Sequence, residues 1–443
     1  MMTKELMLHN RYQQVAELIE QTNASLSGLP RERKYQALLE SPYRFFRGTS
    51  ALFWQDVYND WRYGFFGGSR QTQTWIQGDA HVYNFGAFTN HHREVVYGLD
   101  DFDDALVSDY QYDLWRLAVS IVLCGREQGD LSDQDLRKVL RKLCRSYIHT
   151  LKKIVRGEHH SKGVHFTART SGKPLAGFLE KVERKKNRQK MLDKWTRTQK
   201  NERRVLHREG KIKRVSPQQR KKVLAAFEAY RSRFEDRVFP ADEPKPCLKV
   251  KDVARRLKAG TGSLGKDRFY LLVEGASGAP EDDMILDIKL QDGPAALIAM
   301  TPAQRAIYDR VFDHEGLRHM RAYEALAEHP DPYLGFLEME GAFYSIRERS
   351  PFKKDFPTEN LTKAKHFKAM AKVWGRVIAT EHARGSRSLN EADKMIFPRA
   401  VTDRVCGRKK EFVRLVEEIA IQYATRVEAD YSRWLHENSR PEE

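Results

Sequence analysis

Strand-like and helix-like patterns fall in separate stretches of the chain, and this separation restricts the fold. Short apolar or alternating runs bounded by Gly, Pro and Asp cluster between residues 246 and 350, among them RFYLLVEG, MILDIKL and FYSIRER. Stretches on both sides carry apolar residues at helical spacing, as in residues 114–122 before it and 367–378 after it. The sequence therefore predicts an α+β protein in which one sheet-rich unit lies between largely helical segments.

Five segments can be distinguished along the 443 residues, a length that suits two or three domains or one bilobal enzyme. Residues 1–75 are helical and aromatic, and residues 76–155 combine short strands with two helices. Residues 156–245 read as a basic helical insertion, residues 246–350 as the sheet unit, and residues 351–443 as helices again. Hydrophobic residues make up 40% of the chain, which allows a large buried core.

No part of the sequence predicts export or membrane insertion. The longest apolar runs are too short to cross a bilayer, and the first residues carry neither an apolar secretory core nor a lipidation motif. The cysteines are far apart and lack the spacing of zinc ligands. There are four of them: Cys124, Cys144, Cys247 and Cys406. We expect a cytoplasmic protein with reduced, mostly buried thiols.

Positive charge is concentrated in one segment of the chain. The formal net charge is +17, and residues 181–222 contain 18 Lys or Arg against four acids. Such a local field favours a polyanionic partner, which includes nucleic acid, an anionic membrane surface and an acidic substrate. A solvated basic insertion explains the same pattern, so both interpretations stay open at this point.

The stretch TWIQGDAHVYNFGAF, residues 74–88, begins like a strand and continues as a polar loop. Within it, Asp79 and Asn84 have the D-x-x-x-x-N spacing of kinase-type catalytic loops. In such loops a carboxylate orients or deprotonates the acceptor hydroxyl, and an asparagine binds Mg²⁺. Taken alone, the motif is a weak signal, and an ordinary polar turn explains it better.

A second polar cluster follows the strand-like run VVYGL. Its acids are Asp100, Asp101, Asp103 and Asp104. Like charges at the end of a strand repel one another unless a cation neutralises them, so a bound divalent metal explains the cluster better than a solvated loop does. Asp113 opens the following helix, either as a helix cap or as a support for the catalytic loop.

A third element lies far downstream, in KAGTGSLGKDRFYLLVEG and DDMILDIKL. Gly260, Gly262 and Gly265 form a G-x-G-x-x-G run that leads into a strand rather than a helix, which favours a hairpin over nucleotide phosphates. Lys289 lies in the next strand between Ile288 and Leu290. An ammonium group inside an apolar strand is costly unless it meets an anion, so a phosphate or carboxylate partner is expected.

In combination these motifs resemble a known family. QGDAHVYNFGAF followed by DDFDDALVSDYQYDLWRLAVS is similar to the bacterial family called domain of unknown function 2252, which is placed in the protein-kinase-like superfamily near aminoglycoside and choline phosphotransferases. The stretches FFRG and GTGSLGKDRFYLL with DIKL also match it, so the resemblance covers most of the chain outside the basic segment. It implies a bilobal kinase-like fold and a phosphotransferase that uses ATP and Mg²⁺.

The resemblance also implies roles for individual residues. Asp79 becomes the catalytic base, and His81 contacts the transferred phosphate. Asn84 and Asp101 become metal ligands, with Asp101 the principal one and Asp103 beside it. The acceptor hydroxyl group cannot be identified from these motifs.

Nucleotide binding falls to Lys289 and to a phosphate loop that contains Gly260, Gly262 and Gly265. In an ordinary kinase these elements precede the catalytic loop, whereas here the glycines follow Asp79 by about 180 residues. This order implies a circularly permuted kinase-like fold, with a small antiparallel-sheet lobe and a large helical lobe assembled from both chain ends. Four further side chains are candidate site residues: Arg47, Asp113, His382 and Arg384.

Other functions stay open. Gln77 precedes Gly78 where many phosphotransferases carry histidine, and no glutamate is an evident partner for Lys289, since Glu315 comes late in the following segment. These departures leave room for a pseudokinase or for nucleotidyl transfer.

Two further alternatives use other parts of the same chain. A metal-dependent phosphohydrolase would use Asp79, His81 and Asp101, together with His91 or His92. A protein without enzymatic activity would bind nucleic acid through residues 181–222, where Trp195 is the clear candidate for stacking on a base.

Overall fold

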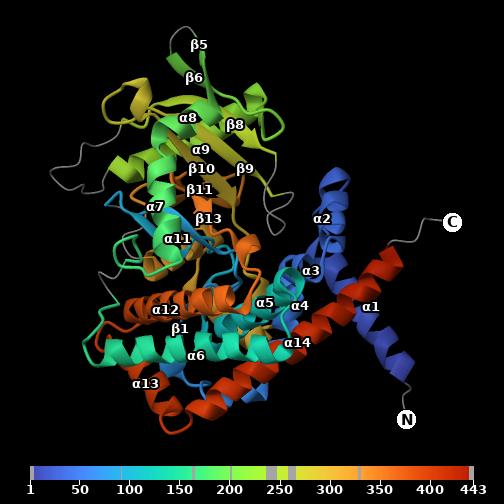
Figure 1. Cartoon of the computed structure of the whole chain (residues 1–443). Coiled ribbons are helices and arrows are strands. Elements are labelled where there is room, and N and C mark those ends of the chain that lie inside the picture. The colour runs from blue at the N-terminus through green and yellow to red at the C-terminus, as the bar shows by residue number, and fades with distance from the viewer. Residues whose placement is uncertain are drawn as a thin grey trace.

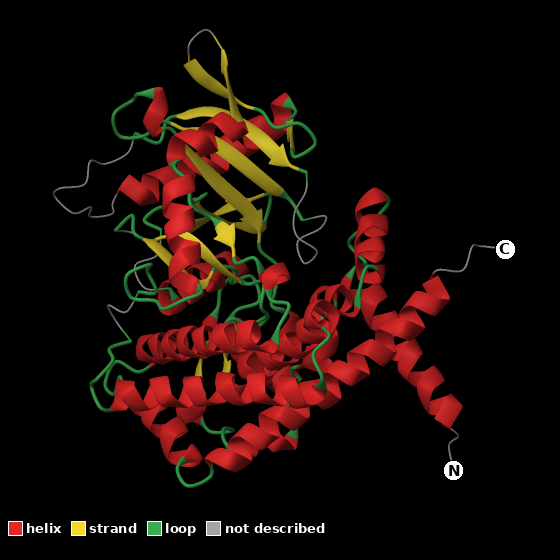
Figure 2. Ribbon diagram, in the orientation of Figure 1, coloured by secondary structure: helices red, strands yellow, loops and turns green. Residues whose placement is uncertain are grey.

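The chain folds into two lobes, one built on a sheet and one built on helices (Figures 1 and 2). The computed structural model describes residues 4–90, 92–161, 165–199, 202–235, 247–257, 266–327 and 331–438. The predicted α+β class is confirmed, because a mainly antiparallel sheet lobe is combined with long helices from both ends of the chain.

A six-stranded antiparallel sheet forms the centre of the sheet lobe, in the order β11-β12-β10-β9-β8-β7. Its strands are β7 (Ile212–Arg214), β8 (Val250–Arg256), β9 (Arg268–Val273), β10 (Met284–Leu290), β11 (Gly335–Met339) and β12 (Ala342–Glu348). β10 lies inside the sheet, where Lys289 is opposite Arg268 on β9 and Ser345 on β12. Side chains alternate along these strands, so each face of the sheet has its own core.

Two helices cover the two faces of this sheet. On one face, Phe227 of α9 (Pro217–Glu235) packs with Phe269 and Leu271. On the other face, Trp195 at the end of α8 (Arg188–Trp195) packs with Tyr270, with ring centroids 5.2 Å apart. Lys289 lies at one end of this second face. The second face is turned toward the helical lobe.

The sheet lobe begins earlier in the chain than residue 246, which is where the sequence patterns placed its boundary. β7 pairs with β8, with Ile212 opposite Arg256. The basic segment also contains the hairpin of β5 (Thr196–Gln199) and β6 (Glu202–Leu206), so it is not a purely helical insertion. Its boundary was misplaced because β7 is too short to give a strand pattern and is stabilised by pairing with a strand far along the chain.

The helical lobe is built around α5 (Gln111–Gly129), in which every residue from Gln111 to Gly125 is buried. α6 (Asp133–Val155) is capped by Ser132, whose side chain accepts a hydrogen bond from the backbone N–H of Asp135. α6 packs along α12 (Ala364–Leu389), and α13 (Ile396–Val405) and α14 (Lys409–Asn438) complete this layer. Three tryptophans are buried in the core of this lobe: Trp115, Trp374 and Trp434.

Both ends of the chain meet in this lobe. α1 (Lys4–Thr22), α2 (Leu29–Leu39), α3 (Pro42–Gly48) and α4 (Ser50–Val57) lie beside α14 (Figure 1). Arg11 of α1 joins them to α14, because its guanidinium donates to Asp56 at 2.8 Å and to Asp430 at 2.7 Å. The remaining long helices are α7 (Leu175–Lys185), α10 (Pro302–Val311) and α11 (Glu315–Leu326).

Short strands connect the helical lobe to the cleft between the lobes. β1 (Gln73–Ile76) pairs with β4 (Leu106–Asp109), while β2 (Phe85–Thr89) pairs with β3 (Val95–Leu99) and with β13 (Lys354–Asp355). The loop from β1 to β2 and the loop from β3 to β4 therefore both cross between the same two small sheets. These are the two polar loops that the sequence singles out.

None of the helices in the described ranges combines the length and apolar character needed to cross a membrane. Two of the four thiols are buried as predicted, those of Cys124 and Cys144. The thiols of Cys247 and Cys406 are exposed.

Replacement of Trp195 tests whether the basic segment is part of the sheet lobe. Trp195 is 2% exposed, so Trp195→Ala is expected to destabilise the protein by about 3–5 kcal/mol, measured by chemical denaturation. Trp61→Ala is the matched control, because Trp61 is 74% exposed and its loss should change stability by no more than about 0.5 kcal/mol. If the two variants were equally stable, the basic segment would not share a core with the sheet lobe.

Candidate functional site

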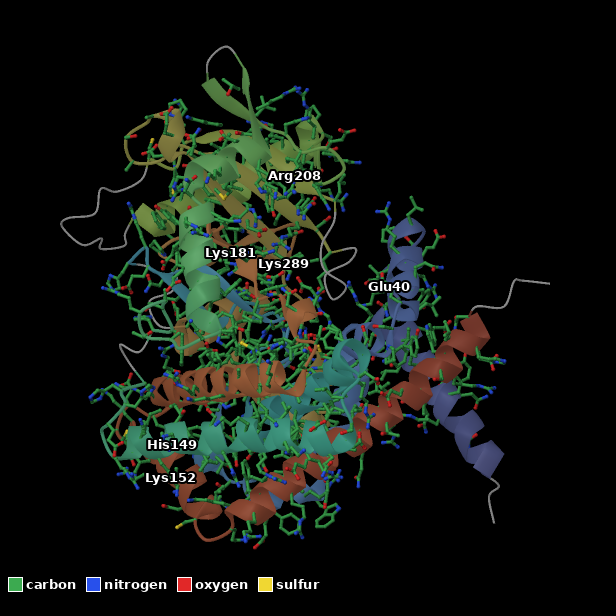
Figure 3. The ribbon with its side chains drawn as sticks, in the orientation of Figure 1. Glu40, His149, Lys152, Lys181, Arg208 and Lys289 are labelled. Atoms are coloured by element: carbon green, nitrogen blue, oxygen red, sulfur yellow. The ribbon has the colours of Figure 1, made fainter. Side chains whose placement is uncertain are left out.

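A cleft with a volume of about 450 Å³ lies between the sheet lobe and the helical lobe. The sequence-predicted residues that line it are Arg47, Asp79, His81, Asn84, Asp101, Asp103 and Lys289. Figure 3 places Lys289 in the sheet lobe, at the side that faces the helices. Side chains from three distant parts of the chain therefore share one cavity.

Lys289 meets the acidic loop directly. Its Nζ atom lies 3.7 Å from Asp101 Oδ1 and forms an ion pair with Asp103. Burial alone would raise the pKa of Asp103, but the ammonium group of Lys289 holds that pKa well below its ordinary range. Burial and the neighbouring charge of Asp103 raise the pKa of Asp101, whose side chain is 40% exposed. Lys289 thus meets carboxylates, one of the two kinds of partner that its place in an apolar strand predicts.

A buried arginine that the motif search did not find holds the backbone of the acidic loop. Arg318 of α11 donates to the carbonyl oxygens of Asp103 at 2.6 Å and of Ala105 at 2.7 Å. It also forms an ion pair with Glu315 on the same helix. The sequence does carry a signal for it: Arg318 lies on one helical stripe with Ala322 and Leu326, and all three are fully buried.

Asp113 of α5 holds the backbone at the start of the loop that carries Asp79 and Asn84. Its two carboxylate oxygens accept the backbone N–H groups of Gln77 at 2.6 Å and of Gly78 at 2.9 Å. Gly78 has a φ of +80°, and a Cβ atom there would lie 1.9 Å from the carbonyl oxygen of Asp104. Glycine is therefore required for the two polar loops to touch.

His382 and Arg384 take part in the scaffold and do not line the cleft. His382 is fully buried, with Nε2 at 3.2 Å from Asp113 and Nδ1 at 2.9 Å from the hydroxyl of Tyr147. Arg384 donates to the carbonyl oxygen of Ser161 at 2.6 Å. His382 thus orients Asp113, which in turn holds the loop.

Asp79 is held by a second buried arginine that the motifs did not indicate. Arg116 of α5 is fully buried, and its Nε atom lies 2.5 Å from Asp79 Oδ1. Burial raises the pKa of Asp79 to about 7, and the guanidinium of Arg116 only partly opposes this shift. A carboxyl group with this pKa can both accept and return a proton near neutral pH.

His81 is buried beside Asp79 in its neutral form. Burial and the charges of Arg47 and Arg116 lower the pKa of His81 well below its ordinary value. Its Nδ1 accepts the backbone N–H of Tyr83 at 3.2 Å, which places the ring proton on Nε2, and Nε2 lies 3.6 Å from Asp79 Oδ2.

Asn84 presents one particular atom to the cleft. Its amide nitrogen donates to the carbonyl oxygen of Asp79 at 2.9 Å, so its amide oxygen is the atom suited to a cation. Magnesium in proteins takes oxygen ligands and usually uses one or two carboxylates together with water and phosphate oxygens. Asp101, Asp103 and Asn84 fit that pattern. Within the described ranges there is no group of three or more His, Cys, Asp or Glu side chains arranged around a metal position.

Arginines from the sheet form the opposite wall of the cleft. Arg268 forms a bidentate pair with Asp287 of β10, with Nε 2.7 Å from Asp287 Oδ1. Arg349 and Arg256 lie over the ring of Trp195, at 4.8 and 5.1 Å from its centroid. Burial lowers the pKa of Arg256. This wall is a concentrated positive surface that faces the acidic loop.

Some predicted residues are not placed by the structure. Gly260, Gly262 and Gly265 lie outside the described residues, in the connection between the paired strands β8 and β9. His91 also lies outside them, and His92 does not line the cleft.

The two lobes, the cleft between them and the acidic loop that lines it define an α+β protein with one charged cleft at the lobe boundary. The chain belongs to the family described as an uncharacterized protein conserved in bacteria (DUF2252), whose model matches residues 31–437. No curated protein and no solved structure gives a significant match to it.

Replacement of Arg318 tests its role in the acidic loop. Arg318→Met leaves several buried carbonyl groups and Glu315 without their partner, so we expect destabilisation by about 3–5 kcal/mol in thermal or chemical denaturation. Arg321→Met, on the exposed side of the same helix, is the control and should have little effect. Similar melting temperatures for both variants would show that Arg318 does not support the loop.

Proposed function

We propose that the cleft binds a nucleoside triphosphate with Mg²⁺ and transfers its terminal phosphoryl group to a hydroxyl acceptor. The observation that carries this proposal is the contact between Lys289 on β10 and the acidic pair Asp101 and Asp103. A lysine on a central strand, metal-type aspartates after another strand, and an aspartate–asparagine loop are the parts that kinase-like phosphotransferases use.

We further propose that the fold is a circularly permuted kinase-like fold. The packing of α1 and α14 in one lobe supports this, because the present ends of a permuted chain mark a point where the unpermuted chain was continuous and are therefore expected to lie close together. The sheet lobe would correspond to the small lobe of a kinase, and α11 would take the place of the helix that lies beside its lysine strand. The strand order around β10 is compatible with this assignment.

In this proposal the residues of the cleft divide the work between ligand and metal. Lys289 would hold phosphate oxygens, while Asp101, Asp103 and the amide oxygen of Asn84 would hold the ion. Bound magnesium neutralises charge on the phosphate oxygens. In the free protein, the ion pair of Lys289 with Asp103 neutralises the charges of both groups. When nucleotide and metal bind, Lys289 would pair with phosphate oxygens and Asp103 with the metal ion.

Asp79 would act as the general base. It would take the proton of the acceptor hydroxyl as that oxygen bonds to the terminal phosphorus and the bond to the leaving diphosphate breaks. Arg116 fixes one carboxylate oxygen of Asp79, and the Nε2 proton of His81 points toward the other. The backbone contact of Asn84 keeps the metal ligand in a fixed position relative to this base.

One observation favours a second candidate, nucleotide binding without transfer. In active kinases a glutamate pairs with the phosphate-binding lysine. Here Glu315 of α11 pairs with Arg318 and accepts the hydroxyl of Tyr308 at 2.8 Å. The α11 side chain that approaches the carboxylate of Asp103 is His319, whose Nε2 lies 3.9 Å from Oδ1. A pseudokinase would show nucleotide-dependent stabilisation and no turnover with any hydroxyl acceptor.

Loss of the lysine or of the metal aspartate tests nucleotide binding. Lys289→Ala and Asp101→Ala should each weaken Mg-ATP binding at least tenfold, because each removes one charge that neutralises the phosphates or the ion. The measurements are calorimetric titration and the ATP-dependent rise in melting temperature. Lys249→Ala is the control, because Lys249 is 70% exposed and does not line the cleft. Unchanged ATP affinity in both cleft variants would refute the proposal.

The pH profile of turnover tests Asp79 as the base. Its carboxylate form is needed, and its pKa is about 7, so kcat/KM should fall about tenfold per pH unit as the pH drops below 7. Turnover is first detected by screening ATP consumption against pools of hydroxylated metabolites. Asp79→Asn should abolish this pH-dependent activity while ATP still binds. A profile that is flat between pH 5 and 8 would exclude Asp79 as the base.

A further inference from the structure

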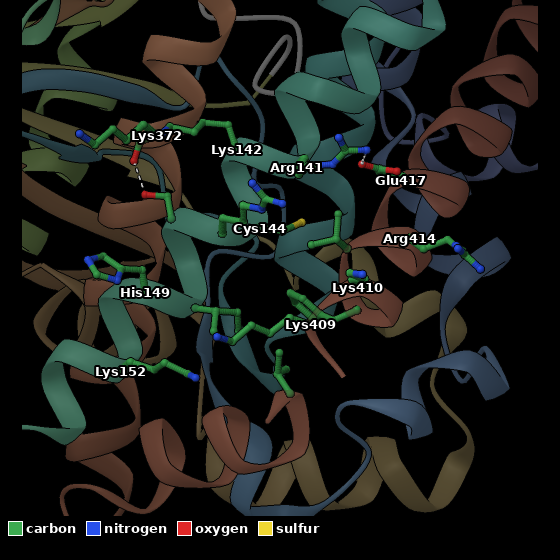
Figure 4. A pocket seen from close by; sticks show the side chains of 16 residues that line it. Arg141, Lys142, Cys144, His149, Lys152, Lys372, Lys409, Lys410, Arg414 and Glu417 are labelled. Atoms are coloured by element: carbon green, nitrogen blue, oxygen red, sulfur yellow. Dashed lines mark hydrogen bonds and ion pairs between the residues drawn. The ribbon is translucent and has the colours of Figure 1, made fainter. Parts of the chain in front are cut away.

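A second cavity opens on the helical lobe, between α6 and α14 (Figure 4). Its volume is about 910 Å³, and α12 and α13 complete its lining. It contains none of the residues assigned to the cleft. We refer to it as the helical groove.

The helical groove is strongly positive. From α6 it takes Arg141, Lys142, Arg145 and Lys152, and from α14 it takes Lys409, Lys410 and Arg414. The single carboxylate in its described lining is Glu417, which is 7% exposed and lies 3.5 Å from Arg141. Cations thus project from two facing helices with almost nothing in the described lining to neutralise them.

Two of these lysines are held against each other. Burial and the adjacent ammonium group of Lys409 lower the pKa of Lys152. Figure 4 shows their side chains reaching toward the same part of the groove from opposite walls. A like-charged pair in this position is relieved when an anion binds between the two groups.

An exposed aromatic pair lies beside the same end of α14. Trp61 is 74% exposed and Phe65 is 43% exposed, with ring centroids 5.3 Å apart. Arg408, the residue before Lys409, donates to the carbonyl oxygen of Phe65 at 3.4 Å. The aromatic pair therefore lies next to the end of α14 from which Lys409 and Lys410 enter the groove.

We propose that this surface binds single-stranded nucleic acid without sequence preference. The groove cations would contact successive phosphates, and Trp61 and Phe65 would stack on bases, which is the combination that single-strand-binding proteins use. An anionic bilayer fits less well, because a flat surface cannot reach cations on two facing walls of a concave groove. The proposal is independent of phosphoryl transfer in the cleft.

The test is fluorescence anisotropy of a labelled 20-nucleotide oligo(dT), titrated with the full-length protein at several salt concentrations. Each phosphate contact contributes about 0.7 to the slope of log affinity against log salt. Lys152→Gln combined with Lys409→Gln should therefore reduce that slope by about 1.4 and weaken binding. Trp61→Ala should weaken binding at least fivefold and leave the slope unchanged, because stacking releases no counterions.

Three controls separate the groove from the rest of the molecule. Lys181→Gln combined with Lys185→Gln makes the same charge change on exposed α7 and should preserve affinity. Lys152→Arg combined with Lys409→Arg keeps the charge and should bind like the wild type. Lys289→Ala should also bind normally, because it lies in the cleft. Melting temperatures establish that every variant is folded.

Two results would overturn the proposal. One is an equal loss of affinity in the groove variant and the α7 variant, which would assign binding to the overall charge. The other is tight binding to vesicles with phosphatidylcholine and phosphatidylserine at 3:1 and none to the oligonucleotide, which would identify a membrane-binding surface instead.

Discussion

Repulsion among four carboxylates in the loop between β3 and β4 is the constraint around which the cleft is organised. The structure compensates each of them in a different way. Lys353 lies 2.8 Å from Asp100, Lys289 lies between Asp101 and Asp103, and the backbone N–H of Ala295 donates to Asp104 at 2.7 Å. All three compensating groups come from the part of the chain after residue 288. The acidic loop of the helical lobe therefore requires the sheet lobe and its flanking segments in order to fold.

Arg318 makes this arrangement rigid, because it binds the loop through backbone oxygens and not through the carboxylates. The side chains of Asp101 and Asp103 are thereby left facing the cleft. On the other side, Asp113 fixes the backbone at Gln77 and Gly78, and Gly78 brings that loop against Asp104. Two rigid loops in contact give a site that is preorganised before any ligand arrives.

The sequence predicted the residues that line the cleft better than the buried residues that hold them in position. Strand periodicity located β9, β10 and β12, and the polar motifs located Asp79, Asp101 and Lys289, because local patterns determine both kinds of signal. Arg116 and Arg318 escaped notice because their importance depends on burial against distant segments. Likewise, His382 looked like a site residue from its motif, yet it supports Asp113 from within the core. Whether a histidine or an arginine lines a site or supports the fold depends on its packing. A single sequence does not show that packing.

Charge gives the clearest example of this limit. The run of basic residues at 181–222 suggested a polyanion-binding segment, but part of that run is built into the sheet lobe, where Arg208 lies 4.1 Å over the ring of Trp195. The helical groove has no counterpart in the linear charge pattern, because Lys152 and Lys409 come from helices that are far apart in sequence. Electrostatic potential depends on distances in space and not on distances along the chain. A positive surface assembled from separate helices is therefore invisible in the sequence, whereas a basic run is conspicuous even where folding disperses its charges.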